Sequence, residues 1–413
     1  MQKFTRLAHL ERGFTPARPV NKFDLFAGRD EQIGRCVGAY VQEGLHIVVY
    51  GERGVGKTSL ANVLPEIIRG AKLPFLDAVR VDCSSESAYE GLWIQACTEL
   101  KHPWPGGEPV NPEAIRFHLQ SLEKSALIVF DELDRFKGRA FDAFAPFADT
   151  IKTLSDHNVQ VTLMLVGVAD SVEHLIGHHE SIARNLSQIE MPRMRPHEAG
   201  SILDKGFAIP QMHATDEVRA EIVRLSEGLP HFVHFLALEA GRVAAEDDRD
   251  EVIISDLSRG IARAVSGHNV MSQYRKATDS PQPGHLYEKV VLACALAPKD
   301  QFGEFRAADI CKPLATVMRR DKVGITTFAR HLKELSTPAR GEVLMKLGTS
   351  HNHRYRFRDP FLQPFAKLVA LKTGLTTTDV LDTYERGQSE GEDMGSWWTH
   401  RHDGSEPPTS RPE

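Results

Sequence analysis

Cysteine is scarce in this sequence, and no apolar run is long enough to cross a membrane. The five cysteines lie far apart and form no Cys-x-x-Cys pair. Scattered cysteines fit a reducing cytosol and exclude both a disulfide framework and a zinc ribbon. No apolar stretch approaches about 18 residues, and the polar N-terminus is unlike a signal peptide. We therefore expect a soluble, cytoplasmic protein with no membrane partner.

The chain also lacks an overall positive charge, since its net charge is −6. This value argues against a protein that binds polyanions over its whole surface. Residues 306–372 differ, because they hold 14 Lys and Arg against 5 Asp and Glu, a local balance of +9 that leaves −15 for the rest. A basic segment on an acidic chain is a candidate surface for nucleic acid.

A glycine-rich loop follows a short β-branched run. Residues 46–50 predict a buried strand, residues 59–64 predict the start of a helix, and Gly-Glu-Arg-Gly-Val-Gly-Lys-Thr lies between them. This loop fits the pattern G-x-x-x-x-G-K-[ST], whose glycines let backbone N–H groups point at phosphate oxygens. The helix N-terminus adds its positive end. The other interpretation, an ordinary glycine-rich turn, is weakened by the strand and helix on either side.

The loop predicts a site for ATP and Mg²⁺. Lys57 would reach the β- and γ-phosphates, and the Thr58 hydroxyl would hold Mg²⁺. A glycine-containing turn just before the strand, at Gly28 and Arg29, would lie against the adenine. The residues of the loop expected to bind ATP are Gly51, Glu52, Arg53, Gly54, Val55, Gly56, Lys57, Thr58 and Ser59.

A second apolar run, residues 127–130, ends in Asp131 and Glu132. A run that is apolar throughout predicts a central parallel strand covered on both faces. Asp131 would then lie at the end of the strand where open α/β sheets bind their ligands. We expect Asp131 to hold Mg²⁺ and Glu132 to polarise the attacking water. The alternative is a strand end followed by a solvated acidic turn.

Strands alternate with helices as far as residue 194, which predicts a parallel sheet with right-handed crossovers. The expected fold is therefore an α/β P-loop NTPase with a helical lid and a C-terminal winged helix. The expected parts are an extended N-terminal arm (1–22), a nucleotide-binding core (23–194), a helical lid (195–271), a linker (272–284), a winged helix (285–372) and a tail (373–413) that is disordered from about 387.

The winged helix is predicted from three helices, at 286–296, 305–318 and 326–335, and two strands, at 343–348 and 354–358. Its third helix would enter the major groove of DNA and its hairpin would follow the backbone. Ile325, Phe328, Leu332 and Leu335 would face the core, as would Tyr355 and Phe357 of the last strand. The candidate DNA contacts are Thr327, Arg330, Lys333, Arg354, Arg356 and Arg358. The alternative is that the strand arginines pair with acids of the ATPase core.

The order of motifs over residues 24–370 resembles AAA+ ATPases of the origin-recognition and STAND-like group, including archaeal-type ATPases with a C-terminal winged helix. The matching pieces are Phe26–Arg29, GERGVGKTS, LIVFDELD, LMLVGVADS, SIARNL and EGLP. The resemblance implies that Arg184 reaches the nucleotide of a neighbouring subunit in a homo-oligomer formed on ATP binding. It implies that Asp170 lies near the γ-phosphate sensor, a position usually held by Asn, Ser or Thr. It also implies that Pro230, in a G-x-P turn, packs near the adenine, which favours a slow nucleotide switch.

Two functions remain open. One is an ATP-driven switch or assembly factor that acts on DNA, in replication, transposition, plasmid maintenance or defence. The other is a STAND-type regulator whose winged helix is an autoinhibitory or protein-binding lid, since winged helices serve both purposes. The sequence carries no nuclease or protease signature, so any output chemistry would lie in an effector protein.

Overall fold

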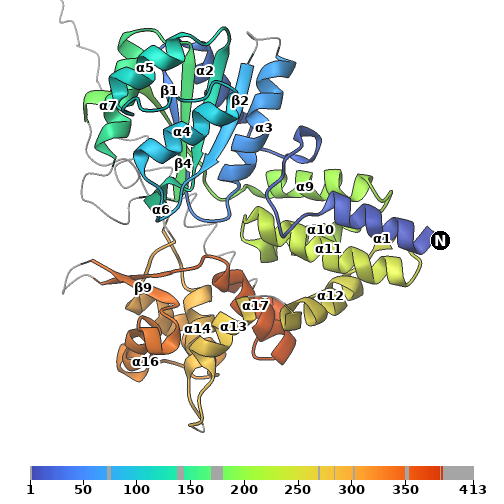
Figure 1. The fold of residues 1–413 in the computed structure, drawn as a ribbon. Helices are drawn as coiled ribbons and strands as arrows, with labels where there is room; N and C mark the ends of the chain where they lie inside the picture. Colours follow the sequence, from blue (N-terminus) through green and yellow to red (C-terminus); the bar gives the residue numbers. More distant parts are fainter. Residues whose placement is uncertain are drawn as a thin grey trace, which may run out of the picture. The chain divides into compact units, whose positions relative to one another are not determined.

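The computed structural model describes residues 2–71, 76–136, 144–168, 180–267, 270–282, 284–300, 303–348, 353–381 and 383–384 (Figure 1). The chain divides into two compact units, Met1–Ala264 and Val265–Glu413, which we describe separately. In the described part of the chain, no helix has both the length and the hydropathy needed to span a bilayer. The tail expected to be disordered from residue 387 lies outside the described residues.

Five parallel strands form the sheet of the first unit. They are β1 (His46–Gly51), β2 (Leu76–Asp82), β3 (Ser125–Asp131), β4 (Val161–Val168) and β5 (Leu186–Glu190). Across the sheet their order is β2-β3-β4-β1-β5. The predicted parallel α/β fold is therefore confirmed, and the C-terminal ends of β1, β3 and β4 meet at one edge of the sheet.

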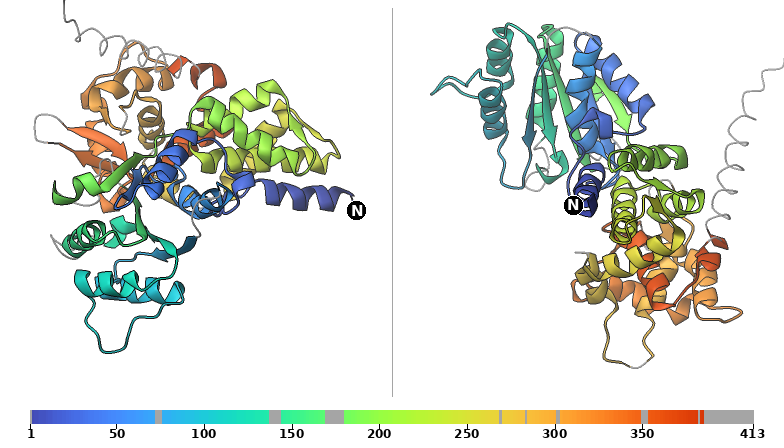
Figure 2. Two further views of the ribbon diagram at one scale, coloured as in Figure 1. Left: turned by 90° about the horizontal axis from the view of Figure 1, so that it is seen from above. Right: turned by 90° about the vertical axis from the view of Figure 1, so that its right-hand side faces the viewer.

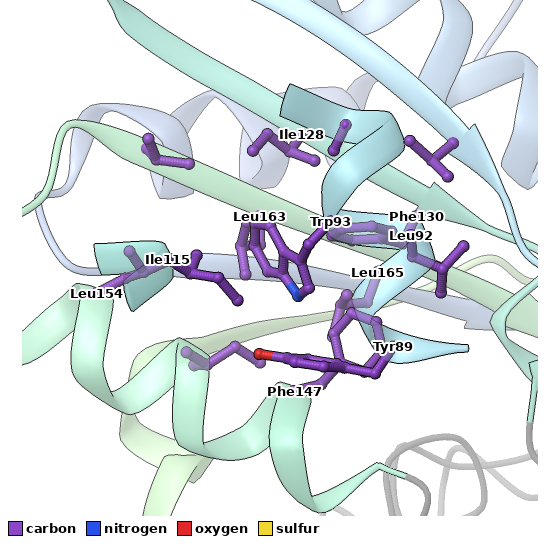
Figure 3. Packing of buried hydrophobic residues seen from close by; sticks show 14 of the residues in the cluster. Tyr89, Leu92, Trp93, Ile115, Ile128, Phe130, Phe147, Leu154, Leu163 and Leu165 are labelled. Carbon is purple, nitrogen blue, oxygen red and sulfur yellow. The ribbon is translucent and has the colours of Figure 1, made fainter. Parts of the chain in front are cut away.

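Helices cover both faces of this sheet. On one face lie α4 (Tyr89–Glu99), α5 (Pro112–Gln120) and α7 (Ala145–Asp156), and on the other lie α2 (Asp30–Val41) and α3 (Lys57–Gly70). Trp93 is fully buried in the first of these layers (Figure 3). Its ring centroid lies 5.2 Å from that of Phe130 on β3 and 6.4 Å from that of Phe147 on α7. This aromatic packing holds the helices of that layer against the strands that carry the site.

Four helices follow the sheet: α9 (Pro196–Ala208), α10 (Asp216–Ser226), α11 (Pro230–Glu246) and α12 (Ile254–Gly267), within which the first unit ends. Proline at the first position starts α9 and α11, and the Thr215 hydroxyl caps α10 by accepting from the Val218 N–H. Only helices were expected here. The structure adds two parallel strands, β6 (His213–Ala214) and β7 (Glu251–Val252), which are too short to give an alternating pattern.

The first residues are helical, so the expectation of an extended arm is wrong for this stretch. Helix α1 (Gln2–Gly13) packs against α9 and α11 (Figure 2). Leu10 and Phe14, spaced by four residues, are fully buried. The Phe14 ring meets that of Phe207 edge-on with centroids 4.7 Å apart, and it lies where a side chain at Gly206 would be. Burial of these two apolar residues accounts for the helix.

The residues that follow α1 run from α11 to α3. The His231 Nδ1 lies 2.9 Å from the Pro16 carbonyl oxygen, and the Thr15 N–H donates to the His234 Nδ1 over 3.4 Å. Farther along, the Val20 N–H donates to the Ser59 hydroxyl over 3.1 Å. Ser59 lies on the first turn of α3. This segment therefore joins the helix that begins at Pro230 to the helix that begins at Lys57.

The second unit combines helices with an antiparallel sheet. The helices are α13 (Val270–Thr278), α14 (Tyr287–Leu296), α15 (Cys311–Val317), α16 (Ala329–Leu335) and α17 (Leu362–Thr373). The strands β8 (Phe305–Arg306), β9 (Leu344–Leu347) and β10 (Arg354–Phe357) pair in the order β8-β10-β9. A hairpin thus follows the third of three helices, α14, α15 and α16, in the expected order. Its assignment as a winged helix remains a prediction.

Three local expectations for this unit are wrong. The expected linker at 272–284 is helical as far as Thr278, because Tyr274 and Ala277 are buried. The helix expected at 305–318 begins with β8 and a 3-10 turn, so only Cys311–Val317 is α-helical. Ile325 is exposed because it lies in a 3-10 turn ahead of α16. The other expected core residues, Phe328, Leu332, Leu335, Tyr355 and Phe357, are buried.

Replacing Phe14 with alanine should lower the free energy of unfolding by about 3–5 kcal/mol, because it opens a cavity against Phe207 and Gly206. Urea unfolding of the full chain, followed by tryptophan fluorescence, measures the change. Phe4→Ala on α1, the helix that Phe14 directly follows, is the matched control, since Phe4 is 76% exposed, and it should change stability by less than about 0.5 kcal/mol. Equal effects of the two variants would show that α1 does not dock through Phe14.

Candidate nucleotide site at the carboxyl edge of the sheet

The loop between β1 and α3 has the backbone that its glycines allow. Gly51, Gly54 and Gly56 have φ values of 145°, 88° and 101°. A Cβ at Gly51 would lie 2.5 Å from the Met191 carbonyl oxygen, so no larger residue fits there. Helix α3 begins at Lys57, directly after Gly56. A curled loop that runs into a helix N-terminus can bind the oxygens of a phosphate chain.

The Lys57 side chain folds back under this loop. Its Nζ donates to the Gly51 carbonyl over 2.9 Å and to the Glu52 carbonyl over 2.8 Å. Burial lowers the pKa of Lys57 from 10.5 to about 8, although the carboxylates of Asp134, Asp131 and Glu52 act in the opposite direction. The buried ammonium is thus held at the loop by carbonyl oxygens and carboxylates, where a phosphate could replace a carbonyl as its partner.

The structure brings together Thr58 and Asp131, the two residues expected to hold Mg²⁺. Asp131 ends β3 and is buried, and its carboxylate accepts from the Thr58 hydroxyl and, over 2.8 Å, from the Glu132 N–H. Burial raises the pKa of Asp131, although these two hydrogen bonds act in the opposite direction. Neighbouring hydroxyl and carboxylate oxygens fit Mg²⁺, which is usually bound by few protein groups together with substrate phosphates.

Glu132 follows in the left-handed region, with φ of 55°. Its carboxylate is about half exposed and forms an ion pair with Arg135, one turn along in the short helix α6 (Leu133–Phe136). A non-glycine residue in this conformation is uncommon and often lies at a functional site. Of the two neighbouring acids, only Asp131 is therefore buried, whereas the Glu132 carboxylate is accessible to solvent.

Sequence reasoning missed two residues that adjoin Asp131 and Lys57. Asp134 accepts a 2.7 Å hydrogen bond from the Val168 N–H at the end of β4, and its carboxylate is the foremost of those that oppose the lowering of the Lys57 pKa. The Arg80 Nε lies 3.9 Å from an Asp131 oxygen and donates to Asp82 over 3.0 Å. The only sequence signals are a third acid after β3 and a charged residue near the end of β2.

Gly28 and Arg29 pack against α9 and against the loop between β1 and α3. The Arg29 guanidinium is buried and donates to the Val55 carbonyl over 3.0 Å and to the Pro192 carbonyl over 2.7 Å. Burial lowers the pKa of Arg29. A Cβ at Gly28 would lie 2.7 Å from the Glu198 Cβ. Arg29 therefore supports the loop through Val55, and its direct contact with adenine remains a prediction.

The remaining predicted residues of this unit lie in different settings. Pro230 begins α11, and its Cγ is 4.0 Å from where a Cβ of Gly56 would be. Val55 is buried, Arg53 is exposed, and Ser59 accepts from the N-terminal segment. Arg184 lies in a 3-10 helix at Glu180–Asn185, and its side chain is 76% exposed and 3.9 Å from Asp156. Asp170 lies outside the described residues.

The predicted DNA contacts in the second unit differ in their exposure to solvent and in their ion-pair partners. Thr327 and Lys333 are exposed, and Arg330 is 79% exposed and paired with Glu334 on the same helix. Arg354 on β10 pairs with Asp300 and Glu304, and Arg358 pairs with Glu342. Arg356 is partly buried. The acids that neutralise Arg354 and Arg358 belong to the second unit itself, which neither alternative had anticipated.

The five-stranded parallel sheet, the glycine-rich loop and the buried lysine at its end define an α/β P-loop NTPase fold. Residues 41–176 match the family described as "AAA domain". No curated protein matches the chain.

Several solved structures are similar over most of their length. Cdc6p from Pyrobaculum aerophilum is 15% identical, with 88% of this chain and 97% of that chain covered and a TM-score of 0.48. A Walker-type ATPase of Pyrococcus abyssi is 15% identical, with 85% and 99% covered and a TM-score of 0.48. Orc1 of Aeropyrum pernix, solved in complex with DNA, is 12% identical, with 84% and 93% covered and a TM-score of 0.47.

The lowered pKa of Lys57 predicts a pH-dependent cost of its burial. Between pH 8 and 10.5 the unfolded chain binds more protons than the folded protein, so this part of the free energy of unfolding rises with pH. Lys57→Met removes the buried charge and should stabilise the protein most below pH 8. The difference in free energy of unfolding between Lys57→Met and the parent, measured with urea, should shrink by about 2 kcal/mol between pH 7 and 10. A difference that stays constant with pH would contradict the burial of a titrating ammonium.

Proposed function

We propose that this chain binds ATP at the loop between β1 and α3 and hydrolyses it slowly, as a nucleotide switch. The observation that carries the proposal is the Lys57 ammonium, held by the Gly51 and Glu52 carbonyls at the N-terminus of α3 and adjacent to Asp131. A buried cation beside a helix N-terminus is suited to a polyphosphate. The match of residues 41–176 to the AAA domain family supports the same conclusion.

Each residue of the site has a proposed role. The glycine loop and Lys57 bind and orient the phosphates, and Pro230 closes on the adenine side. Thr58 and Asp131 would hold Mg²⁺, which when bound offsets phosphate charge. Glu132 would orient the attacking water with its carboxylate. Because Glu132 pairs with Arg135, this carboxylate must exchange one partner for another before it acts, which fits a slow ATPase.

We also propose that hydrolysis takes place in a homo-oligomer. Arg184 is 76% exposed, and its ion pair to Asp156 is long, at 3.9 Å. An exposed guanidinium of this kind is available to the nucleotide of a neighbouring copy, where an arginine finger stabilises the charge of the transition state. Asp170 is the proposed γ-phosphate sensor, by its place after β4.

The Glu132 role can be tested against a control that breaks the same ion pair. Glu132→Gln removes the carboxylate, so ATP turnover should fall by at least about 100-fold while ATP binding persists. Arg135→Gln removes only the partner of Glu132 and should keep turnover within about threefold of the parent or raise it. Phosphate release and calorimetry measure the two quantities. If both variants lose turnover equally, the ion pair is structural and Glu132 does not orient water.

For the second unit we propose a winged helix that binds DNA, in replication, transposition, plasmid maintenance or defence. The supporting observation is the exposed face of α16 and the turn before it, which presents Thr327, Arg330 and Lys333, while Phe328, Leu332 and Leu335 face the core. This division between an apolar and a basic face is what a recognition helix requires.

A specific observation also favours the alternative, a STAND-type regulator whose second unit contacts protein. Arg354 pairs with Asp300 and Glu304, and Arg358 pairs with Glu342. Strand arginines that already have carboxylate partners need no polyanion. In that case an effector protein would supply the output chemistry and α16 would contact it or an autoinhibitory surface.

Salt dependence separates these two functions. If α16 contacts phosphates, Lys333→Ala should weaken binding of duplex DNA of any sequence and reduce the slope of log K against log salt by about one. Lys372→Ala, near the end of α17, removes the same charge outside the proposed face and should leave the slope unchanged. If Lys333→Ala and Lys372→Ala have the same DNA affinity and the same salt slope, the DNA function is excluded and the regulator is favoured.

A further inference from the structure

Arg193 is a partly buried arginine between β5 and α9 that the roles proposed above do not use. Its Nε and Nη2 donate to the two carboxylate oxygens of Glu52 over 2.8 and 3.0 Å, in a bidentate pair. Its Nη1 donates to the Glu227 carboxylate over 3.2 Å and lies 3.4 Å from the Glu227 carbonyl. One guanidinium thus binds two acids that lie more than 170 residues apart in the chain.

The first of these acids belongs to the phosphate-binding loop. Glu52 directly follows Gly51, and its carbonyl oxygen accepts from the Lys57 Nζ. An unpaired carboxylate on a loop that binds polyphosphate would repel the ligand. The bidentate pair with Arg193 offsets this charge and also fixes the direction in which the Glu52 backbone faces Lys57.

The second acid belongs to the turn that precedes α11. Glu227 and Gly228 both have positive φ, 50° and 71°, and the Gly228 carbonyl accepts from the Met194 N–H over 2.8 Å. A Cβ at Gly228 would lie 2.6 Å from the Met194 carbonyl oxygen, so the turn packs closely on the residue next to Arg193. Two residues farther along, Pro230 lies next to Gly56.

We propose that Arg193 is a positioning residue that couples the phosphate-binding loop to the turn carrying Pro230. It holds Pro230 against the loop before nucleotide arrives, and it transmits any movement of Glu52 to the start of α11. The inference rests on the proposed function, because the loop is taken to bind ATP. We therefore expect nucleotide binding at the loop to move the start of α11 through one ion-paired triad, Glu52, Arg193 and Glu227.

The coupling can be tested without nucleotide. Arg193→Met in the full chain should increase amide hydrogen exchange at residues 227–232 by about tenfold or more, while the strands of the sheet keep their protection. Arg195→Met is the matched control, since Arg195 is exposed and only two residues away, and it should leave this exchange unchanged. Arg193→Lys keeps the charge but loses the bidentate geometry, so it should give an intermediate effect if Arg193→Met fails to fold. Equal exchange in the parent, Arg193→Met and Arg193→Lys would overturn the proposal.

A second measurement concerns ATP affinity. Arg193→Met should weaken ATP binding by about 10- to 100-fold in calorimetry, and adding Glu52→Gln should recover part of the loss because no unpaired carboxylate then remains on the loop. Full additivity of the two changes would contradict a shared role. If the parent chain binds no ATP, the proposed function fails, while the exchange experiment still decides whether Arg193 couples the loop to the turn.

Discussion

The burial of the Lys57 ammonium is the constraint on which the rest of the first unit depends. A charged group removed from water needs partners, and these come from two carbonyls of its own loop and from the carboxylates of Asp131, at the end of β3, and Asp134, in α6. The carbonyls are available only because Gly51 has a backbone conformation that other residues avoid. The carboxylates are available only because β3 ends beside β4 at the same edge of the sheet.

Much of this arrangement could be predicted from local patterns. The apolar runs at 46–50 and 127–130 are short and uniform, and such runs belong to buried parallel strands. The glycine spacing specified a loop that the strand and helix on either side placed without ambiguity. The contacts of Arg29, Arg80 and Arg193 could not be predicted in the same way. Each of these arginines meets groups from distant parts of the chain, and a single sequence carries no signal for such long-range pairing.

The second unit shows why a count of charges is weaker evidence than a list of ion pairs. The basic segment begins at residue 306, but the acids that pair with Arg354 are Asp300 and Glu304, just before that boundary. Helix periodicity was more reliable, since Phe328, Leu332 and Leu335 are buried where they were expected. It failed at Ile325 because a 3-10 turn changes the direction in which successive side chains point.

The docking of α1 has a consequence for how the chain folds. The contacts that hold this helix are among the most distant in the sequence, with Thr15 and His234 separated by 219 residues and Glu11 and Arg242 by 231. At ordinary rates of translation, roughly 10–40 s pass between the synthesis of α1 and that of α11. Until α9 and α11 have been made, Leu10 and Phe14 lack the partners that bury them in the native protein. Helix α1 is therefore made long before its native partners and is one of the last helices of the first unit to reach its native position, so its apolar side chains are open to chaperones in the meantime.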